Sequence, residues 1–357
     1  MSVYPKSFFC LLLFLCLAGM PVTSAEGQDK KAVKEPHDPP AASDKIPPRR
    51  ERLPRPGPEM PGFSNDGVTS ERSMIVDPNV AIKLCVSEGD LKINGWKRDE
   101  VRVFVKNGRK FGMKPLEKSV ETGKVNWLLI AHTPSGPPRP ASECLAGDSI
   151  EIDAPIGTSF DLSGRAARTS VDSVKKVKVK IVEGVIMLRN ITGGINAYTS
   201  QGDVMVDNSA GAIALESTTG NIVAIDVKPG QIGELLRAKT NSGAITLQRV
   251  NHRQIEASSI SGSLLFDGEF LTGGIYNFRT SNGSIRLAIP MASSCTFKMT
   301  YGFGSFNSEI PLKILTVDEN PRVKTVVASM GSGSAAVTLI TSSGSIGIKK
   351  SIGAGRP

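Results

Sequence analysis

The sequence predicts an all-β fold: a single-stranded β-helix-like solenoid of short stacked strands, preceded by a disordered tether. Aromatic residues make up only 5% of the chain, whereas 36 of its 357 residues are glycine. Apolar side chains recur at fixed offsets behind glycines from Gly184 onward. No stretch combines the 3.6-residue period with the length of a helix, so short strands and tight turns account best for the composition.

Residues 1–25 have the form of a secretory signal peptide, with Lys6 ahead of an apolar run and cleavage expected after Ala25. The apolar run from Phe8 to Gly19 is shorter than the roughly 20 residues that span a bilayer. We therefore expect an exported chain without a transmembrane segment, located in the periplasm, at the cell surface or outside the cell.

Residues 26–73 are rich in proline and charge and show no apolar periodicity. Such a segment has too little apolar surface to offset the entropy of ordering, so it is predicted to be a disordered linker. Order is expected to begin at Met74, and residues 353–357 are assigned to a tail.

The folded part is predicted to span residues 74–352, with a less regular N-terminal part over 74–160. There, segments rich in Val and Ile alternate with turn residues, as in NVAIKLCV and SIEIDAP. The segment from Lys106 to Ser149 departs from the repeat and is expected to be a surface loop.

The mature chain has three cysteines, so at most one bridge forms within it. Cys85 and Cys144 are the favoured pair, and buried free thiols are the alternative.

Residues 161–352 carry regular glycine-phased repeats, in which polar residues precede a glycine and apolar residues follow two and four positions later. The first copies are nine residues apart: Gly184 with Ile186 and Leu188, Gly193 with Ile195 and Ala197, Gly202 with Val204 and Val206, Gly211 with Ile213 and Leu215, and Gly220 with Ile222 and Ala224. Later copies follow Gly243, Gly262, Gly283 and Gly344, and an early one follows Gly89. Alternation predicts a half-buried strand after each glycine.

An antiparallel meander or sandwich is the alternative architecture, because the dipeptide Asn282-Gly283 alone is a hairpin signal. A solenoid explains more, since every copy has its apolar residues in the same phase, as strands stacked in register require. Two nine-residue phrases then make one coil of about 18 residues.

The phrases CVSEGDLKINGWKRDEVRVFV at 85–105 and APIGTSFDLSGRAARTSVDSV at 154–174, followed by the serial Ser/Thr-x-x-Gly-x-Ile phrases, resemble the putative-adhesin family of uncharacterised secreted bacterial β-solenoid proteins. The resemblance covers about residues 74–352. It implies a β-helix-like body, and it supplies no catalytic residue.

No catalytic, cofactor-binding or metal-binding residues are predicted. His132 adjoins a proline-rich stretch and His252 lies in the polar turn VNHRQ, so both are expected to be exposed loop residues. A nucleophile elbow, C-x-x-C and H-E-x-x-H are all missing from the sequence.

A polysaccharide hydrolase or lyase with a β-helix fold is the alternative function. Asp203 and Asp207 are predicted to point away from the core, about 13 Å apart along one strand, which exceeds the separation that a hydrolytic pair needs. Glu216 or Asp226 on an adjacent coil would have to complete a site. Outward carboxylates on a solenoid also serve solubility and guard strand edges.

A binding surface has better support. In VKKVKVKIV, Lys176, Lys178 and Lys180 alternate with apolar residues, which places three ammonium groups on one strand face as a candidate site for anionic ligands. The net charge of +9 favours anionic polymers as partners, although it also serves solubility. The sequence therefore predicts an exported, non-catalytic adhesin-like or scaffold protein whose partners are anionic polysaccharides or envelope proteins. Nucleic acid is not expected, because no aromatic stacking motif is present.

Overall fold

The computed structural model describes residues 68–133, 144–231 and 233–351, and every regular element in these ranges is a β-strand. Within them no helix is available to cross a membrane. The predicted signal peptide and most of the predicted linker lie outside the described residues. The linker was expected to extend to Ser73, which is wrong, because the first strand begins at Val68 and its residues Ser70–Ile75 pair with a neighbouring strand. This stretch has no alternating apolar pattern, and it is ordered by hydrogen bonding of its backbone to β2 (Glu100–Gly108).

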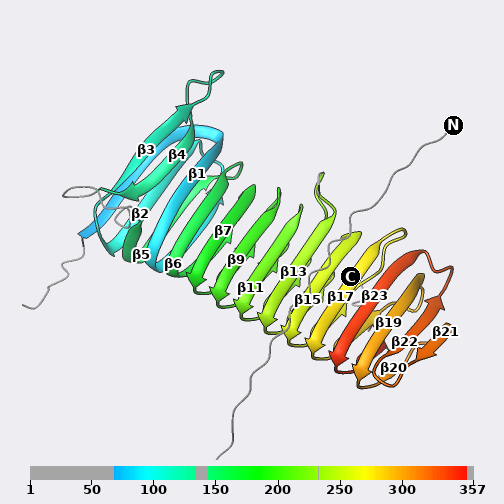
Figure 1. Cartoon of the computed structure of the whole chain (residues 1–357). Coiled ribbons are helices and arrows are strands. Elements are labelled where there is room, and N and C mark those ends of the chain that lie inside the picture. Colours follow the sequence, from blue (N-terminus) through cyan, green and yellow to red (C-terminus); the bar gives the residue numbers. More distant parts are fainter. Residues whose placement is uncertain (1–67, 134–143, 232, 352–357) are drawn as a thin grey trace, which may run out of the picture. The chain divides into compact units, whose positions relative to one another are not determined.

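The central part of the fold is built from two parallel ladders of strands, one longer and one shorter. The longer strands are β7 (Lys176–Glu183), β9 (Ile195–Gln201), β11 (Ile213–Thr219), β13 (Leu235–Ser242), β15 (Gln254–Ser261) and β17 (Ile275–Asn282). The shorter strands are β8 (Ile186–Arg189), β10 (Val204–Asp207), β12 (Ile222–Ile225), β14 (Ile245–Gln248), β16 (Leu264–Asp267) and β18 (Ile285–Ile289). One long and one short strand make one coil, and successive coils stack along a single axis (Figure 1).

The register confirms the predicted solenoid. Ile195 lies beside Val177 on one side and beside Ile213 on the other, all in parallel orientation. The step from Ile195 to Ile213 is 18 residues, which equals two of the predicted phrases. The Asn282-Gly283 dipeptide forms a corner between β17 and β18 and not a hairpin. The apolar residues behind the repeat glycines are all buried and form one continuous core.

The corner between the long and the short strand of each coil is occupied by glycine. A β-carbon built on Gly220 would lie 2.0 Å from the carbonyl oxygen of Gly202 in the preceding coil. Its φ of +152° is also a conformation that side-chain-bearing residues rarely adopt. The same close approach to the preceding coil recurs at Gly184, Gly202, Gly243, Gly262, Gly283 and Gly344. The regularly spaced glycines of the sequence therefore mark the corners at which the backbones of successive coils are in contact.

A second column, of Ser and Thr, lies just before the corner and points inward. Ser217 Oγ donates a hydrogen bond of 2.9 Å to the carbonyl oxygen of Gly202, and Thr240 Oγ1 donates one of 3.0 Å to that of Gly220. Ser259, Thr280 and Thr341 make the equivalent bond to the glycine of the adjacent coil. These hydroxyls satisfy carbonyl groups inside the core, which explains the Ser or Thr three residues before Gly220, Gly243, Gly262, Gly283 and Gly344.

The N-terminal end is closed by a cap of mixed strands. It contains β1 (Val68–Trp96), β2 (Glu100–Gly108), β3 (Phe111–Lys118), β4 (Val125–His132), β5 (Leu145–Pro155) and β6 (Ser159–Asp172). β1 lies between β6 on one side and β4 and β5 on the other, and β2 and β3 add antiparallel strands (Figure 1). The surface loop expected from Lys106 to Ser149 is therefore wrong for much of its length, because β3 and β4 are strands whose Phe111, Leu128 and Ile130 are buried.

The C-terminal end departs from the order of the sequence. It contains β19 (Cys295–Phe303), β20 (Phe306–Ser308), β21 (Lys313–Glu319), β22 (Lys324–Met330), β23 (Ala335–Ser343) and β24 (Ile346–Lys350). β23 pairs in parallel with both β17 and β19, and β24 pairs with both β18 and β20. The last coil in the sequence thus lies between two coils that precede it, as the position of β23 in Figure 1 shows. β22 and β21 then close the end as antiparallel strands.

The structure joins Cys85 of β1 to Cys144 by a disulfide, the pair that the sequence analysis favoured. The bond links β1 to the start of β5, where Val86 lies beside Leu145. Cys295 is buried in the core, and burial raises the pKa of its thiol to about 12. Cys295 therefore packs as a small apolar side chain.

Replacing Gly220 by Ala is expected to lower the free energy of unfolding by more than about 2 kcal/mol, because the new methyl group meets the Gly202 carbonyl and φ is unfavourable. Gly347→Ala is the matched control, since a β-carbon there meets nothing within 4 Å. Urea unfolding of both variants measures the difference. Equal stability of the two variants would contradict the proposed role of the glycine column.

Replacing Cys144 by Ser is expected to lower the free energy of unfolding by about 2–4 kcal/mol, because the bond closes a loop across 59 residues of sequence. Thermal unfolding of wild type and variant, each with and without reductant, measures the effect. Reductant should lower the midpoint of the wild type only. An unchanged wild-type midpoint under full reduction, verified by thiol titration, would show that the bond contributes nothing.

Candidate functional site

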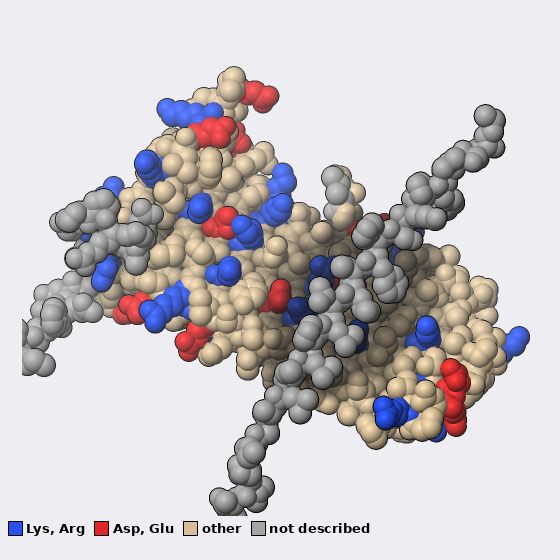
Figure 2. All heavy atoms as spheres, in the orientation of Figure 1, with Lys and Arg blue, Asp and Glu red and all other residues tan. Residues whose placement is uncertain are grey.

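The predicted lysine ladder lies on the outward face of β7. Lys176, Lys178 and Lys180 are exposed, while Val177, Val179 and Ile181, which alternate with them, are buried. Basic side chains are numerous over the N-terminal end of the solenoid, which carries β1 to β7 (Figure 2). The three lysines have different surroundings, which decide what each one can bind.

Lys178 is neutralised by the neighbouring coil. Its Nζ lies 3.2 Å from Oδ2 of Asp161, which occupies the register position beside it on β6. Lys176 lies beside Ser159 and forms no ion pair within the described residues. Lys176 therefore keeps its charge available, whereas Lys178 is less suited to an external anion.

Lys180 lies over an aromatic ring that the sequence analysis did not identify. Its Nζ is 5.5 Å from the ring centroid of Tyr198, the next residue along the same column, on β9. Tyr198 Oη lies 3.2 Å from Oγ of Ser200, and this contact together with Thr218 lowers the pKa of the phenol. Because Tyr198 follows Lys180 by the repeat length of 18, the spacing of the glycine phrases was the signal that would have placed the two side by side.

The arrangement provides two kinds of contact on one flat strand face. The ammonium groups of Lys176 and Lys180 attract anions, and the half-buried Tyr198 ring offers an apolar face for stacking against a sugar ring. Hydroxyls at Ser159, Ser163 and Ser200 supply hydrogen-bonding groups on the flanking strands. We call Lys176, Lys178, Lys180 and Tyr198 the β7 face.

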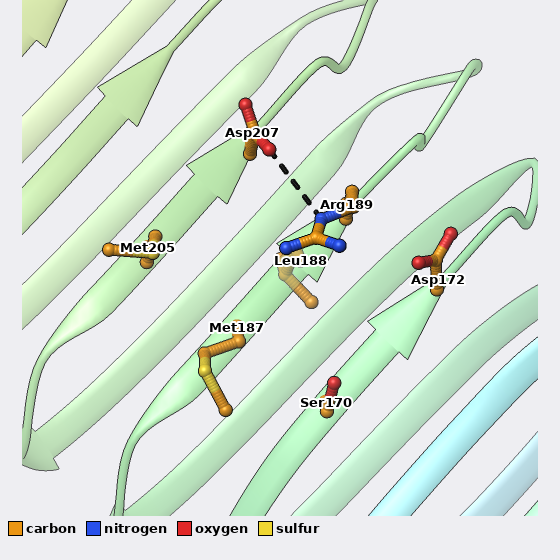
Figure 3. A pocket seen from close by; sticks show the side chains of 7 residues that line it. All are labelled: Ser170, Asp172, Met187, Leu188, Arg189, Met205 and Asp207. Carbon is orange, nitrogen blue, oxygen red and sulfur yellow. Dashed lines mark ion pairs between the residues drawn. The ribbon is translucent and has the colours of Figure 1, made fainter.

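The carboxylates considered for hydrolysis are each engaged by other groups. Asp207 lies 3.5 Å from Nε of Arg189, in a shallow hollow of about 120 Å³ that Met187 and Met205 also line (Figure 3). Asp172, on the other side of Arg189 in Figure 3, accepts a hydrogen bond of 2.8 Å from the Asn190 amide. The hollow therefore holds an ion pair that links adjacent coils.

The other three carboxylates are each engaged by a different partner. Asp203 accepts a hydrogen bond of 2.7 Å from the backbone N–H of Asn221 at the corner. Glu216 lies 3.7 Å from Nζ of Lys239 on the outward face of the long strands. Asp226 receives two hydrogen bonds from the Arg249 guanidinium at the turn after β12, which lower the pKa of its carboxyl. Asp207 and Asp226 lie on neighbouring coils and both act on Arg249, whereas Asp203 lies at the corner and Glu216 on the long-strand face. The described residues therefore do not bring all four groups together.

His252 was expected to be exposed, which is wrong, because its side chain is fully buried in the turn between β14 and β15. Its Nε2 lies 2.9 Å from the carbonyl oxygen of Gly211, so Nε2 carries the proton and donates it. Nδ1 has no hydrogen-bond partner among the described residues. Burial lowers the pKa of this imidazole, against the opposing effects of the Gly211 carbonyl and Glu234. His132, at the end of β4, is only half-buried, and its Nδ1 lies 2.7 Å from the Lys110 carbonyl oxygen.

The fold and its surface define a β-solenoid with antiparallel strands at both ends. No family model matches the chain, and no curated protein matches it. Among solved structures the chain is similar to a Clostridium sporogenes protein named "putative cell adhesion protein", at 14% identity over 79% of this chain and 100% of the other, with a TM-score of 0.20. A score this low does not establish a shared fold, so the assignment of the fold depends on the strand register of this chain alone.

Acid is expected to destabilise the fold through His252. Because its folded pKa lies below 6.5, the unfolded chain takes up a proton first as pH falls, and stability is lost below about pH 6.5. His252→Gln keeps an N–H donor for Gly211 without titrating, and it should lose less in unfolding midpoint between about pH 7.5 and pH 5. Parallel pH profiles for His252→Gln and wild type would refute this role.

Proposed function

We propose that this protein is an exported, non-catalytic binding protein of the adhesin type, whose β7 face binds an anionic polysaccharide. The observation that carries the proposal is the position of Lys180 over Tyr198, beside the unpaired Lys176. Cation and aromatic ring together match a polymer that alternates acidic groups with apolar sugar faces.

The solenoid supports this role because its outward strand faces are flat and long. Side chains in one column are separated by the distance between neighbouring strands, about 4.8 Å, so an extended polymer can contact several coils at once. Most other charges along the long strands are paired between coils, as for Arg237 with Glu256 at 2.8 Å. On the β7 face Lys176 and Lys180 lie on one strand and form no ion pair within the described residues, whereas Arg279 and Lys298, which also form none, lie on separate strands.

Export also supports the proposal. The sequence of residues 1–25 has signal-peptide features, and a disulfide such as that of Cys85 and Cys144 persists in oxidising compartments. A polymer on the outside of a cell is a partner that an exported protein meets. Membership of the adhesin family, drawn from the repeated phrases, is part of the same proposal.

Charge reversal by Lys176→Glu with Lys180→Glu is expected to weaken binding of polygalacturonate by at least about tenfold, because two attractions become repulsions. The matched control is Arg279→Glu with Lys298→Glu, which gives the same net charge in the Lys180 and Lys178 columns at the other end of the ladder. Tyr198→Ala should weaken binding without changing its dependence on salt. Biolayer interferometry with the full chain, with neutral dextran as the reference polymer, measures each affinity.

Two results would count against the proposal. If both double charge reversals weakened binding equally, binding would depend on net charge and not on the β7 face. If the wild type did not bind the polymer at all, the proposal would be wrong. Release of reducing ends from the polymer during the incubation would favour the hydrolase alternative, and release of unsaturated ends would favour a lyase.

A further inference from the structure

The outermost strand of the C-terminal end, β21, is an uncovered edge. Within the described residues it pairs only with β22, and all seven of its residues are exposed. Ile314, Leu315 and Val317 are 48%, 48% and 54% exposed. A strand edge with exposed apolar side chains is a template for pairing with another strand.

The outer strand β3 at the other end of the fold lacks this property. β3, which pairs with β4 as an outer strand there, contains Pro115, and its register shifts at two places between Pro115 and Lys118. Proline lacks the N–H that an added strand would need, so Pro115 discourages edge pairing on β3. β21 contains no proline, so it is better suited than β3 to accept another strand.

The pairing of β21 with β22 fixes which side chains share a face. Ile314 and Val317 lie opposite Ala328 and Val326, which are buried, so they stand on the core side. Lys313 and Asp318 lie opposite Ser329 and Thr325 on the other side. The register shift at Leu315 produces this division, because it makes residues three apart, and not two apart, share a face.

We propose that β21 pairs with β21 of a second copy of this chain, antiparallel and about a two-fold axis. Centred between Leu315 and Thr316, such pairing sets Lys313 opposite Asp318 of the second copy, and Ile314 opposite Val317 of the second copy. Each of these pairs shares a face, as antiparallel pairing requires. The axis generates both contacts twice.

Charge complementarity within β21 selects a second copy as the occupant. Neither Lys313 nor Asp318 has an ion-pair partner within the described residues, whereas Glu319 at the end of the strand is engaged by Lys324 at 3.3 Å. The strand therefore carries one available cation and one available anion at positions that antiparallel self-pairing brings together. A single strand pair buries less than the roughly 800 Å² per partner of stable complexes, so the dimer is expected to dissociate in the micromolar range.

Sedimentation equilibrium of the full chain, between about 1 and 200 µM, tests the proposal. The wild type should form a reversible dimer. Lys313→Asp and Asp318→Lys should each weaken it by at least about tenfold, because each places two like-charged pairs across the axis. The double variant Lys313→Asp with Asp318→Lys should restore dimerisation, since it inverts both charges together.

Controls separate this interface from misfolding and from other surfaces. Val317→Lys should abolish the dimer, and its unfolding midpoint is measured alongside to verify that the variant folds, because Val317 lies on the core side of β21 at 54% exposure. Leu116→Lys on β3 should leave the dimer intact. A monomer across the whole range, a dimer insensitive to the single charge reversals, or no recovery in the double variant would overturn the proposal. None of these results depends on polysaccharide binding.

Discussion

The close approach of backbones at the glycine corners is the constraint on which the rest of the structure depends. At each corner a carbonyl group of one coil occupies the space where a side chain of the next would begin. The Ser and Thr hydroxyls that precede the corner donate to these carbonyl groups and fix the register a second time. Because a parallel ladder slipped by two residues would separate both columns, only one alignment of the coils satisfies them together.

A fixed register turns the outer surface into columns, and the columns decide which charges meet. Asp161 is placed beside Lys178, and Glu216 beside Lys239, by backbone alignment alone. Charges that find a partner in the next coil stabilise the alignment modestly and become less available to ligands. Lys176 on β7, and Lys313 and Asp318 on β21, are among the charges that have no ion-pair partner within the described residues, and they remain available to a ligand or a second chain.

The sequence predicted the repeated interior better than the ends. Alternation behind each glycine identified buried residues such as Ile186 and Leu247, because side chains on a strand alternate between two faces whatever strand lies next to it. The same alternation does not say which coil is the neighbour. Tyr276 lies beside Val337, which follows it by 61 residues, yet nothing local distinguishes this pair from the 18-residue step between Ile195 and Ile213.

The candidate site was predicted in part for the same reason. The lysines on β7 follow from alternation within one strand, whereas Tyr198 and Asp161 reach them across coils. His252 was misjudged because its polar turn is folded against the Gly211 corner, which local composition does not reveal. The strand at Ser70–Ile75 was missed because its pairing uses backbone groups, and its side chains carry no pattern.

The position of β23 and β24 ties completion of the fold to the last part of the chain. Residues 335–343 form the strand that lies between β17 and β19. Residues 346–350 form the strand that lies between β18 and β20. A chain that stops before Ala335 would leave two facing strand edges open in the middle of the stack, at the point where exposed edges aggregate most readily. Synthesis from the N-terminus would thus build most of the ladder early, while its last two strands complete the C-terminal end only after the whole chain has emerged.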